Sequence, residues 1–483
     1  MSNLDSLDKI VSLSKARGFI FQSSEIYGGL SAVYDYGPLG VELKRNIRNA
    51  WWKEMTQRHD NIVGLDAAIF MHPKVWEASG HVGGFNDPMI DDKQSKKRYR
   101  ADMLIEQYIL KLEKDGKKDK AAEIQELLDT TGTRKSLTED LYDIIIENEI
   151  KAPESGAFDW TEVRQFNLMF KTAFGATASE DDAVYLRPET AQGIFVNYKN
   201  VLDTSRVSVP FGIAQTGKAF RNEVVARQFV FRMREFEQME MQYFVEPGTD
   251  EAAYDEWMTK RIAWHKKIGI REENLRFAPH PADKLAHYAR AAADVQYHFP
   301  IGWQEVEGIH NRSDFDLTQH QEFSGKKLDY FDQKNNKRYT PFVIETSIGL
   351  DRCTLMVLCD AYREEEVDGD KRVVLKMHPE LAPIQVGVFP LIKKPELQNI
   401  AHKIANDLRE DFSVQYDETG SIGKRYRRLD EAGTPFCLTV DFDTIEKDDQ
   451  VTIRYRDDMS QIRIPIEKIG DAVKDGIKDW KAE

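Results

Sequence analysis

The chain has 483 residues, enough for two to four domains that each bury a core. Its composition, 41% hydrophobic and 31% charged, is typical of a globular protein, and no apolar run approaches the roughly 20 residues that cross a bilayer. The net charge of −15 excludes indiscriminate nucleic-acid binding by the whole surface, so any such contact needs a local basic patch.

The cysteines and the N-terminal segment indicate the cellular compartment in which the protein works. Cys353, Cys359 and Cys437 lie in apolar stretches and form no CxxC pair, which is typical of reduced core residues. Residues 1–18 show an amphipathic helix pattern and lack the apolar core of a signal peptide. We therefore expect a cytoplasmic protein without a membrane segment.

The first third of the chain predicts a long helix and then an insertion. Pro38 suits the first turn of a helix, and apolar residues recur at helical spacing as far as Met55, before a strand-like stretch over 61–70. Core packing alone explains that spacing. From about 88 to 171 the pattern changes to charge runs and amphipathic helices, which predicts a mostly helical insertion.

Residues 209–245 carry the most informative pattern. Two strand-like runs, about 209–222 and 231–245, are separated by a loop too short for a helix, which favours an antiparallel hairpin. Alternation gives the second run one face of methionines and one polar face, which holds Arg232, Arg234, Phe236, Gln238, Glu240 and Gln242.

That polar face has two interpretations. It is typical of a solvated sheet surface with ion pairs across the strands. It also holds the groups that bind a nucleotide and an amine, since arginines grip phosphates, an aromatic ring stacks on a base, and carboxylates accept hydrogen bonds from amino groups.

Carboxylates and an arginine elsewhere fit the second interpretation. Glu189 precedes a helix-like run, where its charge could simply complement the helix dipole. Glu305 and Glu307 have strand spacing and are expected to share a face, either as solvated glutamates or as Mg²⁺ ligands beside phosphates. Arg352 begins a helix, where a cation opposes the dipole, so phosphate binding explains it better than stability. Residues 255–267 and 284–294 are predicted as outer helices.

A charged linker over 363–372 leads to a composition shift near Pro383. Beyond it, five strand-like runs alternate with helices, which favours a small α/β domain with a largely parallel sheet. One of these helices, 422–429, is basic and is the candidate patch for a nucleic acid, with Lys424, Arg425, Arg427 and Arg428.

Three segments together resemble the class II aminoacyl-tRNA synthetases. Phe220-Arg221-Asn222-Glu223 followed by Arg232-x-x-x-Phe236 is similar to motif 2 of that class. The segments at 187–193, RPETAQG, and at 345–352, ETSIGLDR, narrow the resemblance to the dimeric type of glycyl-tRNA synthetase. The similarity runs nearly end to end, and three such segments in the right order are specific.

The resemblance implies an α/β (α+β) fold. The catalytic domain, over 1–87 and 172–380, is expected to be an antiparallel sheet flanked by helices, with motif 1 at about 34–71, motif 2 at about 209–245 and motif 3 at about 343–362. The helical insertion over 88–171 interrupts it, and an α/β anticodon-binding domain follows over 381–483. Motif 1 builds the homodimer interface in this family.

The implied activity is ATP-dependent attachment of glycine to tRNA(Gly) through a glycyl-adenylate, with Mg²⁺ as cofactor. The catalytic arginines are Arg221 on the α-phosphate and Arg232 and Arg352 on the β- and γ-phosphates. The other implied ATP contacts are Asn222, Glu223, Phe231, Phe236, Glu305, Val306 and Gly349, and Glu305 is also the expected Mg²⁺ ligand. The implied glycine site comprises Arg100, Glu189, Phe236, Glu237, Gln238, Met239, Glu240, Glu345, Ser347 and Gly349.

Two departures and two alternatives qualify this resemblance. Asp92 stands where family members often have a cysteine, so no zinc site is expected, and Thr346 replaces a common proline. A class II synthetase for another amino acid and a non-enzymatic paralogue that kept the fold stay open. Retention of the three arginines, Glu223 and Phe236 argues against the second.

Overall fold

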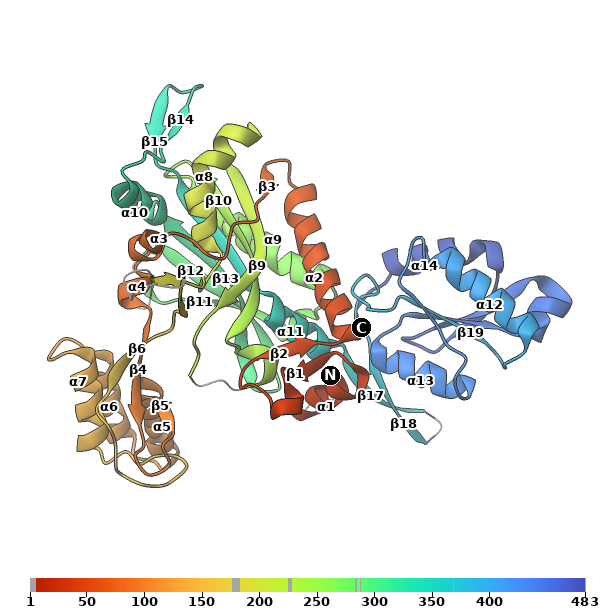
Figure 1. The fold of residues 1–483 in the computed structure, drawn as a ribbon, viewed down its shortest axis with the longest axis horizontal. Helices are drawn as coiled ribbons and strands as arrows, with labels where there is room; N and C mark the ends of the chain where they lie inside the picture. Colours follow the sequence, from red (N-terminus) through yellow and green to blue (C-terminus); the bar gives the residue numbers. More distant parts are fainter. Residues whose placement is uncertain are drawn as a thin grey trace.

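The computed structural model describes residues 6–175, 183–224, 228–282, 285–286, 288–367 and 369–482. Parts of four predicted features lie outside the described residues: 1–5 of the first helix, 225–227 of the motif 2 loop, 284 and 287 of an outer helix, and 368 of the linker. Figure 1 shows a central body between two smaller parts, the C-terminal residues on one side and an inserted helical part on the other.

A seven-stranded sheet forms the centre of the body. Its strand order is β11-β12-β13-β16-β10-β9-β3, and every neighbouring pair is antiparallel except β3 with β9. The strands are β3 (Ile62–Gly64), β9 (Phe211–Phe220), β10 (Glu235–Val245), β11 (Leu275–Pro279), β12 (Ala291–Phe299), β13 (Gly302–Ser313) and β16 (Phe342–Gly349). The predicted antiparallel sheet is confirmed.

Helices cover one face of this sheet completely and the other only in part. On the first face lie α2 (Pro38–Gln57), α9 (Asp250–Lys267) and α11 (Leu350–Ala361), which share the largest core with Met239 and Met241 of β10. On the second face, α8 (Ala191–Ser205) and α10 (Phe315–Ser324) pack over one end, against Phe211 and Phe244. The remaining half of that face, beyond α8, is left for a cavity.

The motif 2 hairpin is shorter than predicted. β10 begins at Glu235, and the residues before it form a 3₁₀ turn, η3 (Phe229–Phe231), followed by an extended link. Arg232 therefore belongs to the connection. Alternation holds along β10 itself, where Met239 and Met241 point into the core and Gln238 and Glu240 point to the cavity side.

The outer helix predicted over 284–294 is wrong, because the described residues before Ala291 form no helix and those from Ala291 onward begin β12. Alanine has the highest helix propensity, so the run AAAD favours a helix locally. The strand forms because it pairs with β11 on one side and β13 on the other, and such pairing overrides local propensity.

The expectation that Glu305 and Glu307 share a face is also wrong. The register with β12 shifts between them, since Gln296 pairs with Glu305 while its neighbour Val295 pairs with Glu307. The extra residue, Val306, forms a β-bulge, which turns the two carboxylates to opposite faces. Glu305 reaches the cavity, and Glu307 is buried against α9, 2.5 Å from Arg261.

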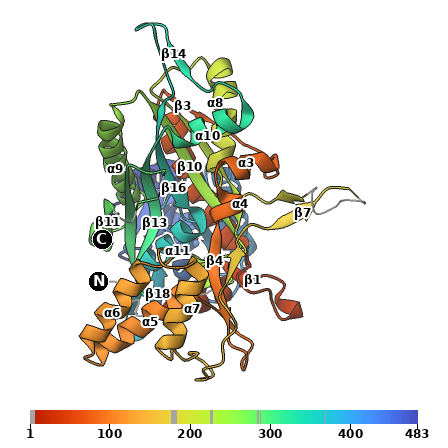
Figure 2. The same cartoon turned by 90° about the vertical axis from the view of Figure 1, so that its left-hand side faces the viewer.

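The inserted part is attached to the body by two strands. β4 (Asn86–Asp91) enters it and β6 (Arg164–Asn167) leaves it, and both pair with each other beside β5 (Arg98–Arg100). Three helices, α5 (Ala101–Lys114), α6 (Lys118–Asp129) and α7 (Leu137–Glu147), enclose a separate apolar core on this small sheet (Figure 2). Ser136 and Glu139 form the predicted capping box at the start of α7.

The C-terminal part contains a mixed sheet. Its strand order is β20-β19-β21-β22-β23, in which the first three strands are parallel and the last two antiparallel. The "largely parallel" prediction is therefore corrected, because the five-residue turn over 456–460 is too short for a parallel crossover. The elements are β19 (Val386–Pro390), α12 (Pro395–Leu408), β20 (Val414–Tyr416), α13 (Ile422–Ala432), β21 (Phe436–Val440), β22 (Gln450–Tyr455), β23 (Gln461–Pro465) and α14 (Ile469–Lys478).

The predicted charged linker is an ordered hairpin. β17 (Tyr362–Val367) continues directly from α11 and pairs with β18 (Asp370–Leu375). Arg372 of this hairpin is fully buried and bonds to Asp430 of α13 at 2.8 Å, which joins the body to the C-terminal part. The charged run that indicated a linker is thus a two-stranded hairpin, in which Arg372 is turned inward and Lys371 is exposed.

Shorter elements complete the fold. They are α1 (Leu7–Arg17), β1 (Ile20–Gln22), η1 (Glu25–Tyr27), β2 (Tyr34–Tyr36), α3 (Pro73–Ala78), α4 (His81–Gly84), β7 (Lys171–Ala173), β8 (Ala183–Tyr185), η4 (Glu272–Asn274), β14 (Tyr330–Asp332), β15 (Lys337–Tyr339), η6 (Thr444–Asp448) and η7 (Ile466–Lys468). The three cysteines are buried and free, as predicted. Among the described helices, none has the length and apolar character to cross a bilayer.

Candidate active site

A polar cavity of about 230 Å³ lies over the uncovered half of the sheet. Strands β10, β13 and β16, the start of α11 and the turn before β10 supply its walls. It gathers most of the residues singled out from the sequence: Glu189, Arg221, Phe231, Arg232, Phe236, Gln238, Glu240, Glu305, Glu345, Ser347, Gly349 and Arg352.

One end of the cavity is basic. Arg221 follows β9, and its guanidinium lies 5.3 Å from the ring centre of Phe236 while its Nε donates to the Pro188 carbonyl at 3.0 Å. Arg352, in the first turn of α11, lies over the Phe231 ring at 4.5 Å and faces Glu305 at 3.3 Å. Such planar cations, held by rings and carbonyls, are suited to phosphate oxygens.

Glu305 is ionised by its neighbour. Desolvation opposes its charge, but the Arg352 guanidinium, with smaller contributions from His310 and Arg221, lowers the pKa of this carboxyl below its usual range. In the described part of the chain, no group of three His, Cys, Asp or Glu side chains gathers to hold a metal ion. One carboxylate beside a phosphate site is nevertheless sufficient for Mg²⁺, which takes most of its ligands from phosphate and water.

The other end of the cavity is acidic. Glu189 precedes α8, Glu240 lies on β10, and Glu345 lies on β16. The Arg312 guanidinium at 3.1 Å and the His310 ring at 2.7 Å counter the burial of Glu345 and hold its pKa low. Glu189 is likewise kept ionised, with its pKa well below the usual range.

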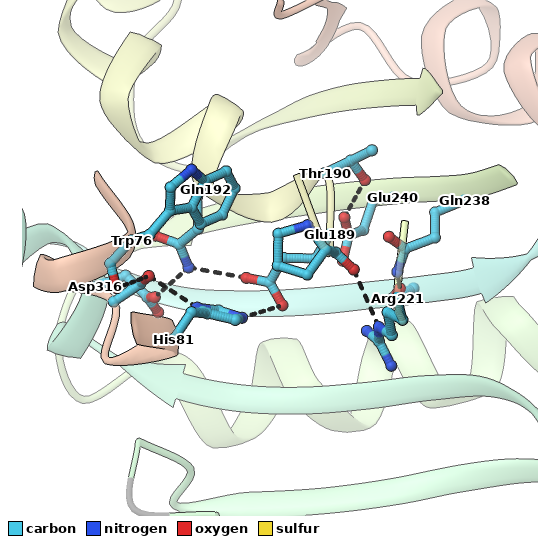
Figure 3. Close-up of polar contacts among 12 residues, drawn as sticks. Trp76, His81, Glu189, Thr190, Gln192, Arg221, Gln238, Glu240 and Asp316 are labelled. Atoms are coloured by element: carbon cyan, nitrogen blue, oxygen red, sulfur yellow. Dashed lines mark hydrogen bonds and ion pairs between the residues drawn. The ribbon is translucent and has the colours of Figure 1, made fainter. Parts of the chain in front are cut away.

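Glu240 is the exception among these carboxyls. Burial, together with the negative charges of Glu345 and Glu189, raises its pKa well above the usual range, and the Thr190 hydroxyl that bonds to it offsets this only in part (Figure 3). Next to it, the Gln238 amide donates to the Ser347 hydroxyl at 3.3 Å, and its Oε1 has no partner among the described residues. A cationic donor would satisfy both groups.

Some predicted site residues do not reach the cavity. The side chains of Glu237 and Met239 lie on the opposite face of β10, because alternate residues of a strand point to opposite sides. Glu237 pairs there with Arg48 at 2.8 Å, and Met239 is part of the core. Val306, at the bulge, is buried in the same core.

Three further predicted residues lie outside the lining. Arg100, at the end of β5, pairs with Asp102 at 2.6 Å and with Asp87 at 3.1 Å. Asn222 and Glu223 follow Arg221 beyond the end of β9, and the backbone N–H of Asn222 donates to the carbonyl of Leu168, the residue after β6. Their roles with ATP or glycine stay predictions.

The cavity also holds residues that sequence reasoning missed. Gly308, His310 and Arg312 alternate along β13 and face the cavity together, and this period-two pattern is the sequence signal that could have found them. Tyr288 packs over the Arg312 guanidinium at 4.0 Å. Asp351, the neighbour of Arg352 in the chain, accepts hydrogen bonds from the Lys44 ammonium at 2.7 Å and from the backbone N–H of Glu237 at 2.7 Å. These two bonds fix the start of α11.

Family models match three successive parts of the chain. They are the glycyl-tRNA synthetase insertion domain 1 at 87–130 and 116–168, the class II tRNA synthetase core domain for G, H, P, S and T at 170–362, and the anticodon binding domain at 385–476. Among solved structures, a prolyl-tRNA synthetase from Cryptosporidium parvum with L-proline and AMP aligns with a TM-score of 0.63 and 13% identity, over 99% of this chain and 77% of that one. That likeness shows the fold alone.

Relatives of known activity are similar over nearly the whole length. A glycine–tRNA ligase of Chlorobaculum tepidum is 58% identical, over 96% of this chain and 98% of its own. A glycine–tRNA ligase of Treponema denticola is 52% identical, over 99% of this chain and 98% of its own. Together with the cavity, these likenesses show that the chain belongs to the glycine–tRNA ligase family of class II aminoacyl-tRNA synthetases.

Proposed function

We propose that this chain attaches glycine to tRNA(Gly) in two steps. The glycine carboxylate attacks the α-phosphate of ATP to give glycyl-adenylate and pyrophosphate, and a terminal ribose hydroxyl of the tRNA then attacks the adenylate and releases AMP. The observation that carries the proposal is the division of one cavity into a basic end and an acidic end, with Phe236 among its lining residues.

The basic end suits the triphosphate. Arg221 would neutralise the charge that develops on the α-phosphate, while Arg232 and Arg352 would hold the β- and γ-phosphates. The Phe236 ring offers a stacking plane for adenine. No side chain has to form a covalent bond in this scheme, so the rate enhancement comes from positioning and electrostatic stabilisation.

The acidic end suits the ammonium of an amino acid. Glu189 and Glu240 supply the negative charge, and the free Oε1 of Gln238 supplies a third acceptor. Ser347, on the neighbouring strand opposite Glu240, limits the space at the α-carbon. Since glycine has no side chain to recognise, rejection of larger amino acids requires a rigid wall of this kind.

Mg²⁺ fits this arrangement through Glu305 alone, since Glu307 faces α9 on the other side of the sheet. The ion would spread the charge of the β- and γ-phosphates. Arg352, at 3.3 Å, orients the Glu305 carboxylate at the cavity edge.

The C-terminal part is proposed to read the anticodon, but with a smaller basic patch than the sequence indicated. Arg425 of α13 is buried and donates to the carbonyls of Pro390, Glu418 and Gly420. Arg428 pairs with Asp417. Lys424 is exposed and Arg427 is half-buried, and these two residues of the patch remain available to phosphates.

A homodimer assembled through motif 1, working in the cytoplasm, completes the proposal. The test of assembly is light scattering on the purified chain, where a mass of twice 55.7 kDa is expected and a mass of one chain would contradict it.

The activity itself is tested by charging total tRNA with each amino acid in turn. Glycine alone should be attached, and its attachment should need ATP. A different amino acid as the preferred substrate would make the chain a synthetase of other specificity, and ATP binding without any charging would make it a binding paralogue.

A further inference from the structure

The Glu189 carboxylate is held from behind by groups that the proposed chemistry does not use. Its Oε1 accepts from the Gln192 amide at 3.0 Å, and its Oε2 faces Nε2 of His81 at 3.4 Å (Figure 3). His81 does not line the cavity. It therefore contacts the carboxylate from the side that a substrate in the cavity does not reach.

Local structure fixes the His81 ring. Its Nδ1 lies 2.8 Å from the Ser79 hydroxyl, so Nε2 is the nitrogen left to face Glu189. The ring packs edge-on between Trp76, at 5.7 Å between ring centres, and Phe85, at 5.4 Å. Gly80, with φ of +79°, makes the sharp turn that brings His81 to the start of α4.

Gln192, the second holder of Glu189, is fixed in the same way. Its amide nitrogen also donates to Asp316 at 3.1 Å, and its oxygen faces Nε2 of His320 at 2.8 Å. Both oxygens of the Glu189 carboxylate thus have a donor whose own orientation is set by other contacts.

The charges around Glu189 explain why such support is needed. Glu240 and Glu345 are two further buried carboxyls beside the same space, and negative charges on neighbouring carboxyls repel one another. Arg312 is already bound by Asp316 and Glu345. The donors that contact Glu189 directly are therefore His81 and the Gln192 amide, and of these two only an imidazole can carry a positive charge to balance the carboxylate.

We propose that His81 is a positioning residue for glycine, which holds the Glu189 carboxylate ionised and aimed at the substrate ammonium without touching the substrate. This inference rests on the proposed function, since it assigns a purpose to Glu189. The opposing explanation is packing, because His81 also lies between two aromatic rings of a small core that includes Trp76 and Phe85.

Two substitutions separate these explanations because each keeps what the other removes. His81→Phe preserves an aromatic ring between Trp76 and Phe85 but removes the nitrogen that faces Glu189. His81→Gln preserves a donor and removes the ring. Glycine-dependent exchange of pyrophosphate into ATP gives the Michaelis constants of glycine and ATP for each variant.

If His81 positions Glu189, His81→Phe raises the glycine Michaelis constant roughly 10–100-fold, the effect of losing a hydrogen bond to a charged group. The Michaelis constant of ATP should change less than about twofold, and His81→Gln should recover most of the loss. Ser79→Ala, which frees Nδ1, should give a smaller shift in the same direction. His59→Phe, at a histidine that faces Trp257 outside the cavity, is the matched control and should behave as the wild type.

The opposite pattern overturns the inference. A nearly normal His81→Phe with a defective His81→Gln makes the residue a packing element, and so does an equal rise of both Michaelis constants. Should His81→Phe fail to fold, Ser79→Ala decides alone, and an unchanged glycine Michaelis constant then rejects the positioning role. Absence of glycine-dependent exchange in the wild type would reject the proposed function instead, so the two failures are distinguishable.

Discussion

The cavity and the junction with the C-terminal part both bury arginines beside carboxylates, and they differ in whether those charges are matched. At the junction, Asp430 is bound by Arg372 at 2.8 Å and by Arg454 at 2.9 Å. Arg456 beside them donates to the carbonyls of Gly433 and Met377, each at 2.8 Å. This network is closed, because each of these charges meets an opposite charge or a carbonyl.

The acidic end of the cavity is an open network. Arg312 satisfies Glu345 and Asp316, yet Glu240 has hydroxyl partners and no cation, and the Gln238 oxygen has no partner within the described chain. Buried polar groups are normally matched, so a group of unmatched acceptors indicates a place for a ligand. A closed network of charges therefore holds two parts of the molecule together, whereas an open network is completed by a substrate.

The closed network predicts the largest effect. Asp430→Asn leaves Arg454 buried without its counter-charge and leaves Arg372 with Glu365 as its carboxylate partner. It should lower the free energy of unfolding by about 3–5 kcal/mol. Asp443→Asn is the matched control, because Asp443 forms an exposed i,i+4 pair with Lys447, and exposed pairs contribute little to stability. Denaturant unfolding measures both. Equal stability of the two variants would show that the junction is not a closed network.

At the basic end, Arg221→Ala should lower the rate of adenylate formation by about 10²–10³, since one well-placed donor to developing charge contributes this much. The melting temperature should change little, because Arg221 borders a cavity. Pyrophosphate exchange gives the rate, with Arg276→Ala at an exposed arginine over Trp303 as control. Near-normal exchange in Arg221→Ala would contradict its assignment to the α-phosphate.

Glu240→Gln should weaken glycine binding and leave the fold intact. Its folded pKa lies above the unfolded one, so Glu240 favours the folded state fully below the unfolded pKa, and this contribution is lost as pH rises through the folded pKa. The Gln variant should therefore lose that pH dependence of stability and be at least as stable at neutral pH. Its glycine Michaelis constant should rise roughly tenfold with that of ATP unchanged.

Glu235→Gln, at the exposed start of the same strand, is the control for that variant. An equal weakening of ATP and glycine in Glu240→Gln would make Glu240 a structural residue of β10 and place the ammonium elsewhere.

The smallest effect is expected at the wall of the acidic end. Ser347→Gly enlarges the space opposite Glu240, and one methylene group contributes only about 1–3 kcal/mol to discrimination. Alanine should then support measurable pyrophosphate exchange, with glycine still preferred. Complete exclusion of alanine by the variant would mean that another residue forms the wall.

The sequence predicted helices, strands and cavity residues well where the signals for them are local. Periodic apolar residues set the limits of α2, and the motif 2 and motif 3 segments placed Arg221, Glu240 and Arg352, which the structure brings to one cavity. These signals work because helix and strand periods are short-range, and because each motif lies within a single pair of elements.

What the sequence could not predict depends on partners distant in the chain. The bulge at Val306 exists only in the register with β12, and it decides that Glu305 alone faces the cavity. His81 meets Glu189 across more than a hundred residues. Arg372 was predicted as part of a charged linker because its partner, Asp430, comes from another part of the chain.

Proton release on glycine binding tests the open network most directly. If the ammonium completes it, Glu240 must give up the proton that burial and its neighbours keep on it at neutral pH. Calorimetric titration of glycine in buffers of different ionisation enthalpy counts that proton. The wild type should release a fraction approaching one proton for each glycine bound, and Glu240→Gln should release none. Binding of glycine to the wild type without proton release would contradict the account.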